Sequence, residues 1–129
     1  MNAIRITVIV KKLLENLDWI DGKSEREAER CQKFGGYRDP DQFLSHMRQI
    51  RMLCEPAIRS LKDIEKDIEE SVQNLNTKDI TSRLYAARSN LKAISSIYST
   101  NLDVLYPQMN RSCVDSIDLL NELIDVLFE

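Results

Sequence analysis

Large hydrophobic residues recur at steps of three and four along residues 79–106, a spacing that places them on one face of a helix. They are Ile80, Leu84, Ala87, Leu91, Ile94, Tyr98, Leu102 and Leu105. The opposite face carries small residues at alternating steps of four and three: Ser82, Ala86, Ser89, Ala93, Ser96 and Thr100. An exposed helix face usually carries long charged side chains, which here lie mostly on the flanks. The pattern therefore predicts a central helix, about 79–106, that is covered on both sides.

The partner of this small-residue stripe, Ser82 to Thr100, is either internal or external. Small side chains let two helix backbones approach more closely than the usual separation of about 8–10 Å. The neighbour is another helix of this chain or the same stripe on a second copy, because a self-complementary face suits a twofold dimer. Packing inside the chain is the preferred interpretation, and a homodimer is the alternative.

A second long pattern runs from Pro40 to about residue 75. Its hydrophobic face consists of Phe43, Met47, Ile50, Cys54, Ala57, Leu61, Ile64, Ile68, Val72 and Leu75. Pro56 lies inside this run, where a proline kinks or breaks a helix. Because the pattern keeps its phase across Pro56, it predicts one long kinked helix, about 40–75. Asp39 is the expected N-cap, and Gly35 and Gly36 before it are expected to turn with positive φ.

The rest of the chain predicts three further helices. Over residues 3–21 the stripe is Ile6, Val10, Leu13, Leu14, Leu17 and Ile20, and Gly22 is expected to end it. Ser24 and Glu27 then have the spacing of a capping box, which would begin a short charged helix to Phe34. Pro107 is expected to end the helix 79–106. A final helix, about 110–128, has Cys113, Ile117, Leu120, Ile124 and Leu127 on its hydrophobic face.

The predicted fold is therefore all-α: a single domain, residues 1–129, built as an antiparallel bundle of about five helices. Hydrophobic residues make up 43% of the chain and charged residues 30%, an ordinary balance for a globular protein. A net charge of −3 argues against a general nucleic-acid binder. Three widely spaced cysteines indicate reduced thiols, and neither a signal peptide nor a membrane span is recognisable. We therefore expect a cytoplasmic protein with no membrane partner.

Catalytic and metal-binding chemistry finds little support in the sequence. His46 is the only histidine, so the paired Glu-x-x-His motifs of a di-iron bundle cannot form. A zinc site would have to gather His46 and three separated cysteines from different helices. A cysteine nucleophile would need a neighbouring base, and no spacing brings a cysteine close to His46. We expect no catalytic residues, no cofactor and no metal, and hence a protein that is not an enzyme.

Two charged faces are the remaining candidate sites. The acidic face consists of Asp115, Asp118, Glu122 and Asp125. Because it lies opposite the hydrophobic face of the last helix, a solvated surface is expected there rather than a metal site. The basic face consists of Arg48, Arg51, Arg59, Lys62 and Lys66 on the helix 40–75, with Arg38 from the glycine turn. It is a candidate for binding an anion or a partner.

The leading hypothesis is a non-enzymatic protein-protein interaction or regulatory protein that binds a protein partner or itself through helical surfaces. A bacterial immunity- or antitoxin-like inhibitor, or an adaptor, is one form of this hypothesis, by analogy of size and charge alone. The alternative is a nucleic-acid- or phosphate-binding protein or enzyme. It would use the basic face around Arg38, His46, Arg48 and Arg51.

Overall fold

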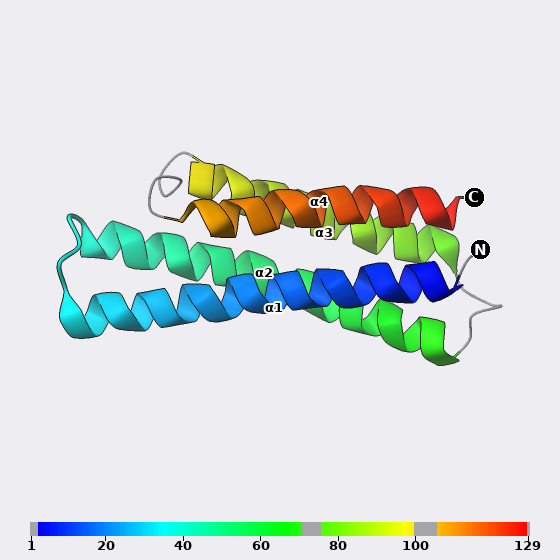
Figure 1. Ribbon diagram of the computed structural model, residues 1–129, viewed down its shortest axis with the longest axis horizontal. Helices are drawn as coiled ribbons and strands as arrows, with labels where there is room; N and C mark the ends of the chain where they lie inside the picture. The colour runs from blue at the N-terminus through cyan, green and yellow to red at the C-terminus, as the bar shows by residue number, and fades with distance from the viewer. Residues whose placement is uncertain (1–2, 71–75, 100–105, 129) are drawn as a thin grey trace.

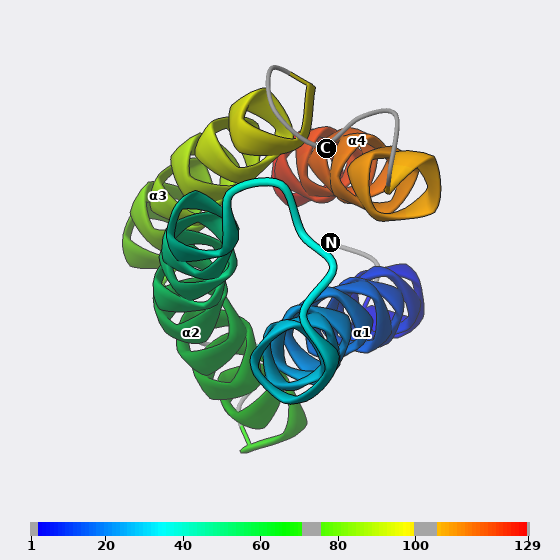
Figure 2. The same ribbon diagram turned by 90° about the vertical axis from the view of Figure 1, so that its left-hand side faces the viewer.

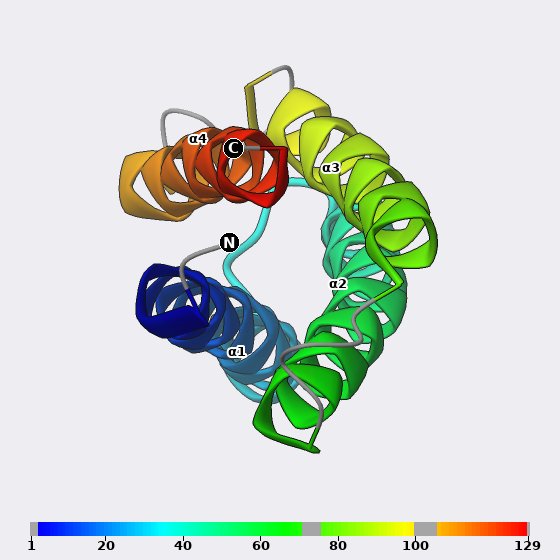
Figure 3. The same ribbon diagram turned by 90° about the vertical axis from the view of Figure 1, so that its right-hand side faces the viewer.

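Four helices form an antiparallel bundle in the computed structural model, which describes residues 3–70, 76–99 and 106–128 (Figure 1). They are α1 (Ala3–Phe34), α2 (Pro40–Glu70), α3 (Thr77–Ile97) and α4 (Pro107–Leu127). Each helix packs against its neighbours in the chain, and α4 returns beside α1 to close a ring (Figure 2, Figure 3). The all-α prediction is confirmed over these ranges. The described ranges contain four helices, so the prediction of about five is wrong.

Gly22 does not end the first helix, and this accounts for the missing fifth helix. α1 continues through Gly22 to Phe34. Ser24 and Glu27 are not a capping box, because the Ser24 hydroxyl donates to the carbonyl of Ile20 at 2.8 Å within the same helix. Both side chains are buried in the bundle. Their spacing of three residues is the spacing of two core positions on one helix face, which a capping box happens to share.

Buried positions in every helix follow alternating steps of four and three, the heptad spacing of left-handed helical bundles. On α1 and α2 they include Ile6, Val10, Leu13, Leu17, Ile20, Ser24, Glu27 and Cys31, and Phe43, Met47, Ile50, Cys54, Ala57, Leu61, Ile64 and Ile68. On α3 and α4 they include Ile80, Leu84, Ala87, Leu91 and Ile94, and Met109, Cys113, Ser116, Leu120, Leu123 and Leu127. The predicted hydrophobic stripes therefore form most of the core, but Ile117 of the predicted α4 face is only partly buried, and the buried positions of α4 include Ser116 and Leu123 instead. Val72, Leu75, Leu102 and Leu105 lie outside the described residues.

α3 is not a central helix covered on both sides. It packs against α2 and α4 through one face, and in the view along the bundle it occupies one position of the ring (Figure 2). The small-residue stripe faces outward, with Ser82, Ala86, Ser89, Ala93 and Ser96 all exposed. Thr100 lies outside the described residues. The preference for packing this stripe inside the chain is therefore wrong, because the four helices of the described ranges close the ring and none of them covers this face of α3.

α2 runs through Pro56 from Pro40 to Glu70, which confirms one continuous helix there. The remainder of the predicted span, 71–75, lies outside the described residues. Asp39 is the N-cap as predicted, since its carboxylate accepts from the backbone N–H of Gln42 at 3.1 Å. Pro56 has no N–H to bond the carbonyl one turn earlier. In that turn, the Asn90 amide of α3 donates to the Leu53 carbonyl at 3.2 Å.

The two remaining helix starts differ from the prediction by a few residues. α3 begins at Thr77, and Asn76 caps it by accepting from the N–H of Asp79 at 3.1 Å. Pro107 begins α4, and the prediction that it ends the helix 79–106 is wrong, because α3 ends at Ile97. A proline is well suited to the first position of a helix, because its missing N–H would have no partner there.

Candidate functional site

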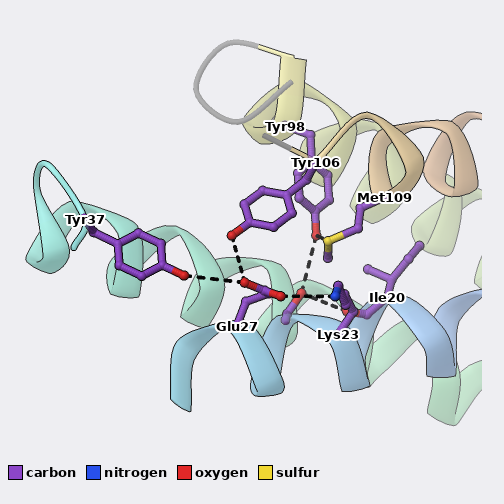
Figure 4. A network of polar contacts seen from close by, with 8 residues as sticks. Ile20, Lys23, Glu27, Tyr37, Tyr98, Tyr106 and Met109 are labelled. Atoms are coloured by element: carbon purple, nitrogen blue, oxygen red, sulfur yellow. Dashed lines mark hydrogen bonds and ion pairs between the residues drawn. The ribbon is translucent and has the colours of Figure 1, made fainter. Parts of the chain in front are cut away.

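The carboxylate of Glu27 is the meeting point of α1, the α1–α2 turn and the start of α4 (Figure 4). Glu27 lies on α1 and is only 6% exposed. Its Oε2 accepts a hydrogen bond from the Tyr106 hydroxyl at 2.9 Å and a longer one from the Tyr37 hydroxyl at 3.5 Å. Its Oε1 pairs with Lys23 Nζ at 3.1 Å. A buried charge is tolerated only with such partners, so this network also ties three segments together.

The α1–α2 turn brings Tyr37 to this carboxylate through two glycines. Gly35 and Gly36 have φ of 65° and 83°, which confirms the predicted left-handed turn. The ring of Tyr37 then lies 4.4 Å from that of Phe43, and the Phe43 ring lies 6.1 Å from that of Tyr106, measured between centroids. The aromatic residues therefore hold both hydroxyls at the end of the bundle.

A pocket of about 490 Å³ opens beside this network. Its lining consists of Glu27, Arg30, Gly36, Tyr37, Arg38 and Tyr106. Arg30 and Arg38 are exposed, whereas Glu27 is buried. A space of this volume falls within the range of small-molecule sites, about 300–1,000 Å³. We refer to it below as the turn pocket.

The electrostatics of the network keep Glu27 charged and Tyr106 neutral. Burial alone would raise the pKa of Glu27, but hydrogen bonds from Lys23 and Tyr106 and the charges of Lys23 and Arg30 lower it below 4.5. Burial and the hydrogen bond to Glu27 raise the pKa of Tyr106 well above its ordinary value of 10.0. The tyrosine therefore acts as a donor to a carboxylate over the whole physiological pH range.

A second buried polar chain lies one turn deeper in the bundle (Figure 4). The Ser24 and Tyr98 hydroxyl oxygens are 3.4 Å apart, and the Tyr98 hydroxyl donates to Met109 Sδ at 3.5 Å.

Burial raises the pKa of Cys113 to about 12 and raises that of Cys54 further. Both thiols are free and protonated, which makes them poor nucleophiles.

A groove of about 600 Å³ runs between α1 and α2. Its lining is Asp18, Asp21, Ala28 and Gln32 from α1, and Leu44, Met47, Arg48, Arg51, Met52, Glu55, Ile58 and Lys62 from α2. The acids of the α1 wall face cations of the α2 wall, and Arg51 Nε bridges to Asp21 at 3.2 Å. Met52 is 65% exposed, so part of the apolar lining is open to solvent. We call this feature the α1–α2 groove.

The predicted basic face is divided between these two sites. Arg38 lines the turn pocket, whereas Arg48, Arg51 and Lys62 line the α1–α2 groove, and His46 belongs to neither lining. Ion pairs neutralise several of its members: Arg51 with Asp21 and Glu25, Arg59 with Glu55 at 2.8 Å, and Lys66 with Glu70 at 4.0 Å. The structure therefore does not bring Arg38, His46, Arg48 and Arg51 together as one anion site.

The acidic face of α4 lies on the surface. Asp115, Asp118, Glu122 and Asp125 are all exposed, and Glu122 pairs with Arg5 of α1 at 3.3 Å. Over the described residues, no three histidine, cysteine, aspartate or glutamate side chains are grouped so that they could hold a metal ion.

Of the residues that line the turn pocket, only Arg38 belongs to a candidate site predicted from the sequence. The sequence spacing places Glu27 in a capping box, and Arg30, Tyr37 and Tyr106 follow no pattern of their own. One signal does exist, because the core spacing of α1 continues from Ile20 through Ser24 and Glu27 to Cys31. A carboxylate at a core position requires polar partners from other segments.

Comparison with family models, with curated proteins and with solved structures finds no match to this chain. Within the described ranges, no helix combines the length and the hydropathy needed to cross a membrane.

Proposed function

We propose that this chain is a non-enzymatic, cytoplasmic interaction protein that binds an amphipathic helix of a protein partner in the α1–α2 groove. The observation that carries the proposal is a groove in which apolar residues, among them the exposed Met52, lie between acidic residues of α1 and mainly basic residues of α2. Methionine adapts its shape to different apolar surfaces, and helix-in-groove recognition uses apolar anchors at helical spacing.

The charges along the groove specify what the partner helix should carry. Arg48 and Lys62 lie on the α2 wall, fourteen residues apart, and among the described residues neither forms an ion pair. Fourteen residues of helix span about 21 Å. A partner helix with two acidic residues about two heptads apart on one edge, and apolar residues between them, would complement this wall.

The α1 wall adds a preference for direction. Asp18 and Asp21 lie on this wall, opposite the cations of α2. A partner helix with basic residues along its second edge would face these acids, and the reverse placement would put like charges together. Such like-charge contacts disfavour wrong partners and wrong orientations.

Site-specific crosslinking tests this proposal. A photoreactive amino acid in place of Met52 should crosslink the partner in the native host, and the crosslinked segment should be an amphipathic helix of the stated pattern. The same amino acid in place of Val114, which is 44% exposed on α4, is the matched control. Capture should fall in Arg48→Glu and Lys62→Glu and persist in Lys92→Glu, which reverses a charge on α3. Equal crosslinking from positions 52 and 114, or a partner segment without apolar helical spacing, would contradict the proposal.

A further inference from the structure

The turn pocket carries more positive charge than its own carboxylate neutralises. Glu27 is paired with Lys23, whose Nζ lies 3.1 Å from Oε1. Arg30 and Arg38 line the same pocket as Glu27. In the described part of the chain, neither guanidinium forms an ion pair. Because Lys23 neutralises Glu27, Arg30 and Arg38 remain as two cations in the lining of the pocket. This surplus matches a ligand with two negative charges.

The polar groups of the pocket are arranged to accept a ligand beside these arginines. Both tyrosine hydroxyls donate to Glu27, so their protons are already used and the arginines are left to donate to an anionic ligand. Lys23 and the two hydroxyls occupy both oxygens of Glu27, which reduces its repulsion of an anion. The rings of Tyr37 and Tyr106 line the pocket, and both pack against the buried ring of Phe43.

We propose that the turn pocket binds a small phosphomonoester, with Arg30 and Arg38 on the phosphate and the tyrosine rings against its organic part. A phosphomonoester carries about −1.5 to −2 charge at neutral pH, which suits two guanidinium groups. The planar guanidinium donates two parallel hydrogen bonds to such an anion. This site is independent of the α1–α2 groove. A negative result for phosphate binding would therefore not count against the proposed binding of a partner helix.

An NMR titration of the full chain with phenyl phosphate, methyl phosphate and succinate tests this assignment. Phenyl phosphate should shift the backbone amides of Gly36, Tyr37 and Arg38 and the side-chain signal of Arg30, and should bind more tightly than methyl phosphate. Affinity should rise between about pH 5 and pH 7, because the second phosphate proton leaves near pH 6. Glu27 stays charged over this interval, since its pKa lies below 4.5. Succinate, a dianion without phosphate, should bind more weakly.

Single substitutions separate a built site from general surface charge. Arg30→Ala and Arg38→Ala should each weaken phenyl phosphate binding by about tenfold or more, as expected for lost charge-assisted hydrogen bonds. Arg26→Ala removes the same charge from the exposed surface of α1, one turn away, and should leave binding unchanged. All three residues are exposed, so circular dichroism should show the folded protein in each case. Equal losses in all three variants, signals that shift over the whole cationic surface, tighter binding of succinate or no shift at millimolar ligand would each overturn the assignment.

Discussion

The hydroxyl of Tyr106, the residue before α4, donates a 2.9 Å hydrogen bond to Glu27, about two turns before the end of α1. The two residues are 79 positions apart in the sequence, so this bond joins the last helix to the first at one end of the bundle. The Tyr37 hydroxyl reaches the same oxygen of Glu27, but at 3.5 Å. Since hydrogen bonds weaken as they lengthen, the two tyrosines should contribute unequally.

We therefore predict that Tyr106→Phe destabilises the fold more than Tyr37→Phe. Tyr106→Phe removes a short hydrogen bond to a buried charge and should lower the free energy of unfolding by about 2 kcal/mol. Tyr37→Phe should lower it by less than about 1 kcal/mol, because its bond is long. Urea unfolding followed by circular dichroism measures both. Equal losses would show that the two hydroxyls share the carboxylate evenly and that the difference in length has no energetic meaning.

Glu27 should also make the fold sensitive to acid. Its partners hold its pKa in the folded protein below the value of 4.5 expected in the unfolded chain. As the pH falls below 4.5, the unfolded chain binds a proton that the folded chain does not, so protonation favours unfolding. The stabilisation is fully present at neutral pH and is lost as the pH falls through the lower, folded-state pKa.

The measurement is the free energy of unfolding at several pH values for the wild type and for Glu27→Gln. The variant should be less stable at neutral pH, because Lys23 and the tyrosine hydroxyls lose their charged acceptor. Its stability should then fall less steeply than that of the wild type below about pH 4.5. Parallel curves for the two proteins would show that other carboxylates account for the acid sensitivity.

Glu27 also shows where sequence reasoning reaches its limit in this fold. Heptad spacing alone predicts which residues of each helix are buried, because the same face must meet the core at every turn. Gly22 is different, because a glycine can either end a helix or lie within it, and α1 continues through this position. With that boundary misplaced, Glu27 looked like a capping residue. Its partners, Tyr37 and Tyr106, come from distant segments, and only the closed ring of four helices brings them together.

The small-residue stripe on α3 also shows a limit of prediction from residue spacing. Its regular spacing on α3 is real, but spacing does not say which of two opposite faces meets a neighbour. The large face, from Ile80 to Ile94, is buried and the small face is exposed. Burial of large side chains contributes far more hydrophobic free energy than burial of serine and alanine, which decides the orientation of the helix.

The three thiols should differ in their reaction with a thiol reagent. Cys54 and Cys113 are fully buried, Cys54 near the middle of α2 and Cys113 almost two turns into α4, and burial raises the pKa of both, to about 12 for Cys113. Cys31 is also buried but lies one turn from the end of α1. Helix ends open more readily than bundle centres, so Cys31 should react first. Ellman's reagent should label Cys54 and Cys113 only at the rate of global unfolding, and all three rapidly in urea. Fast labelling of Cys54 in the native protein would contradict this order.

The hydrogen bond from Asn90 to the Leu53 carbonyl should depend on Pro56. Pro56 cannot donate to the carbonyl one turn earlier, and its ring crowds that turn of α2. Asn90 supplies a donor to the same turn from α3. Asn90→Ala should therefore lower the free energy of unfolding by about 1 kcal/mol, and by less when Pro56→Ala is also present. A double-mutant cycle by urea unfolding measures the coupling. Additive effects would show that the two residues act separately.

Ala93→Glu and Ala87→Glu give a matched test of the orientation of α3. Both place a carboxylate on the same helix, six residues apart, but Ala93 is exposed whereas Ala87 is 2% exposed. Ala93→Glu should change the free energy of unfolding by no more than about 0.5 kcal/mol, as surface substitutions usually do. Ala87→Glu buries an unpaired charge in the core and should destabilise the fold by about 3 kcal/mol or more.

Thermal unfolding reports both changes, and light scattering of the same samples reports the oligomeric state. A folded monomer from Ala93→Glu where the wild type is a dimer would identify the stripe as a contact between copies. Loss of the fold in Ala93→Glu would mean that the stripe is covered within the chain.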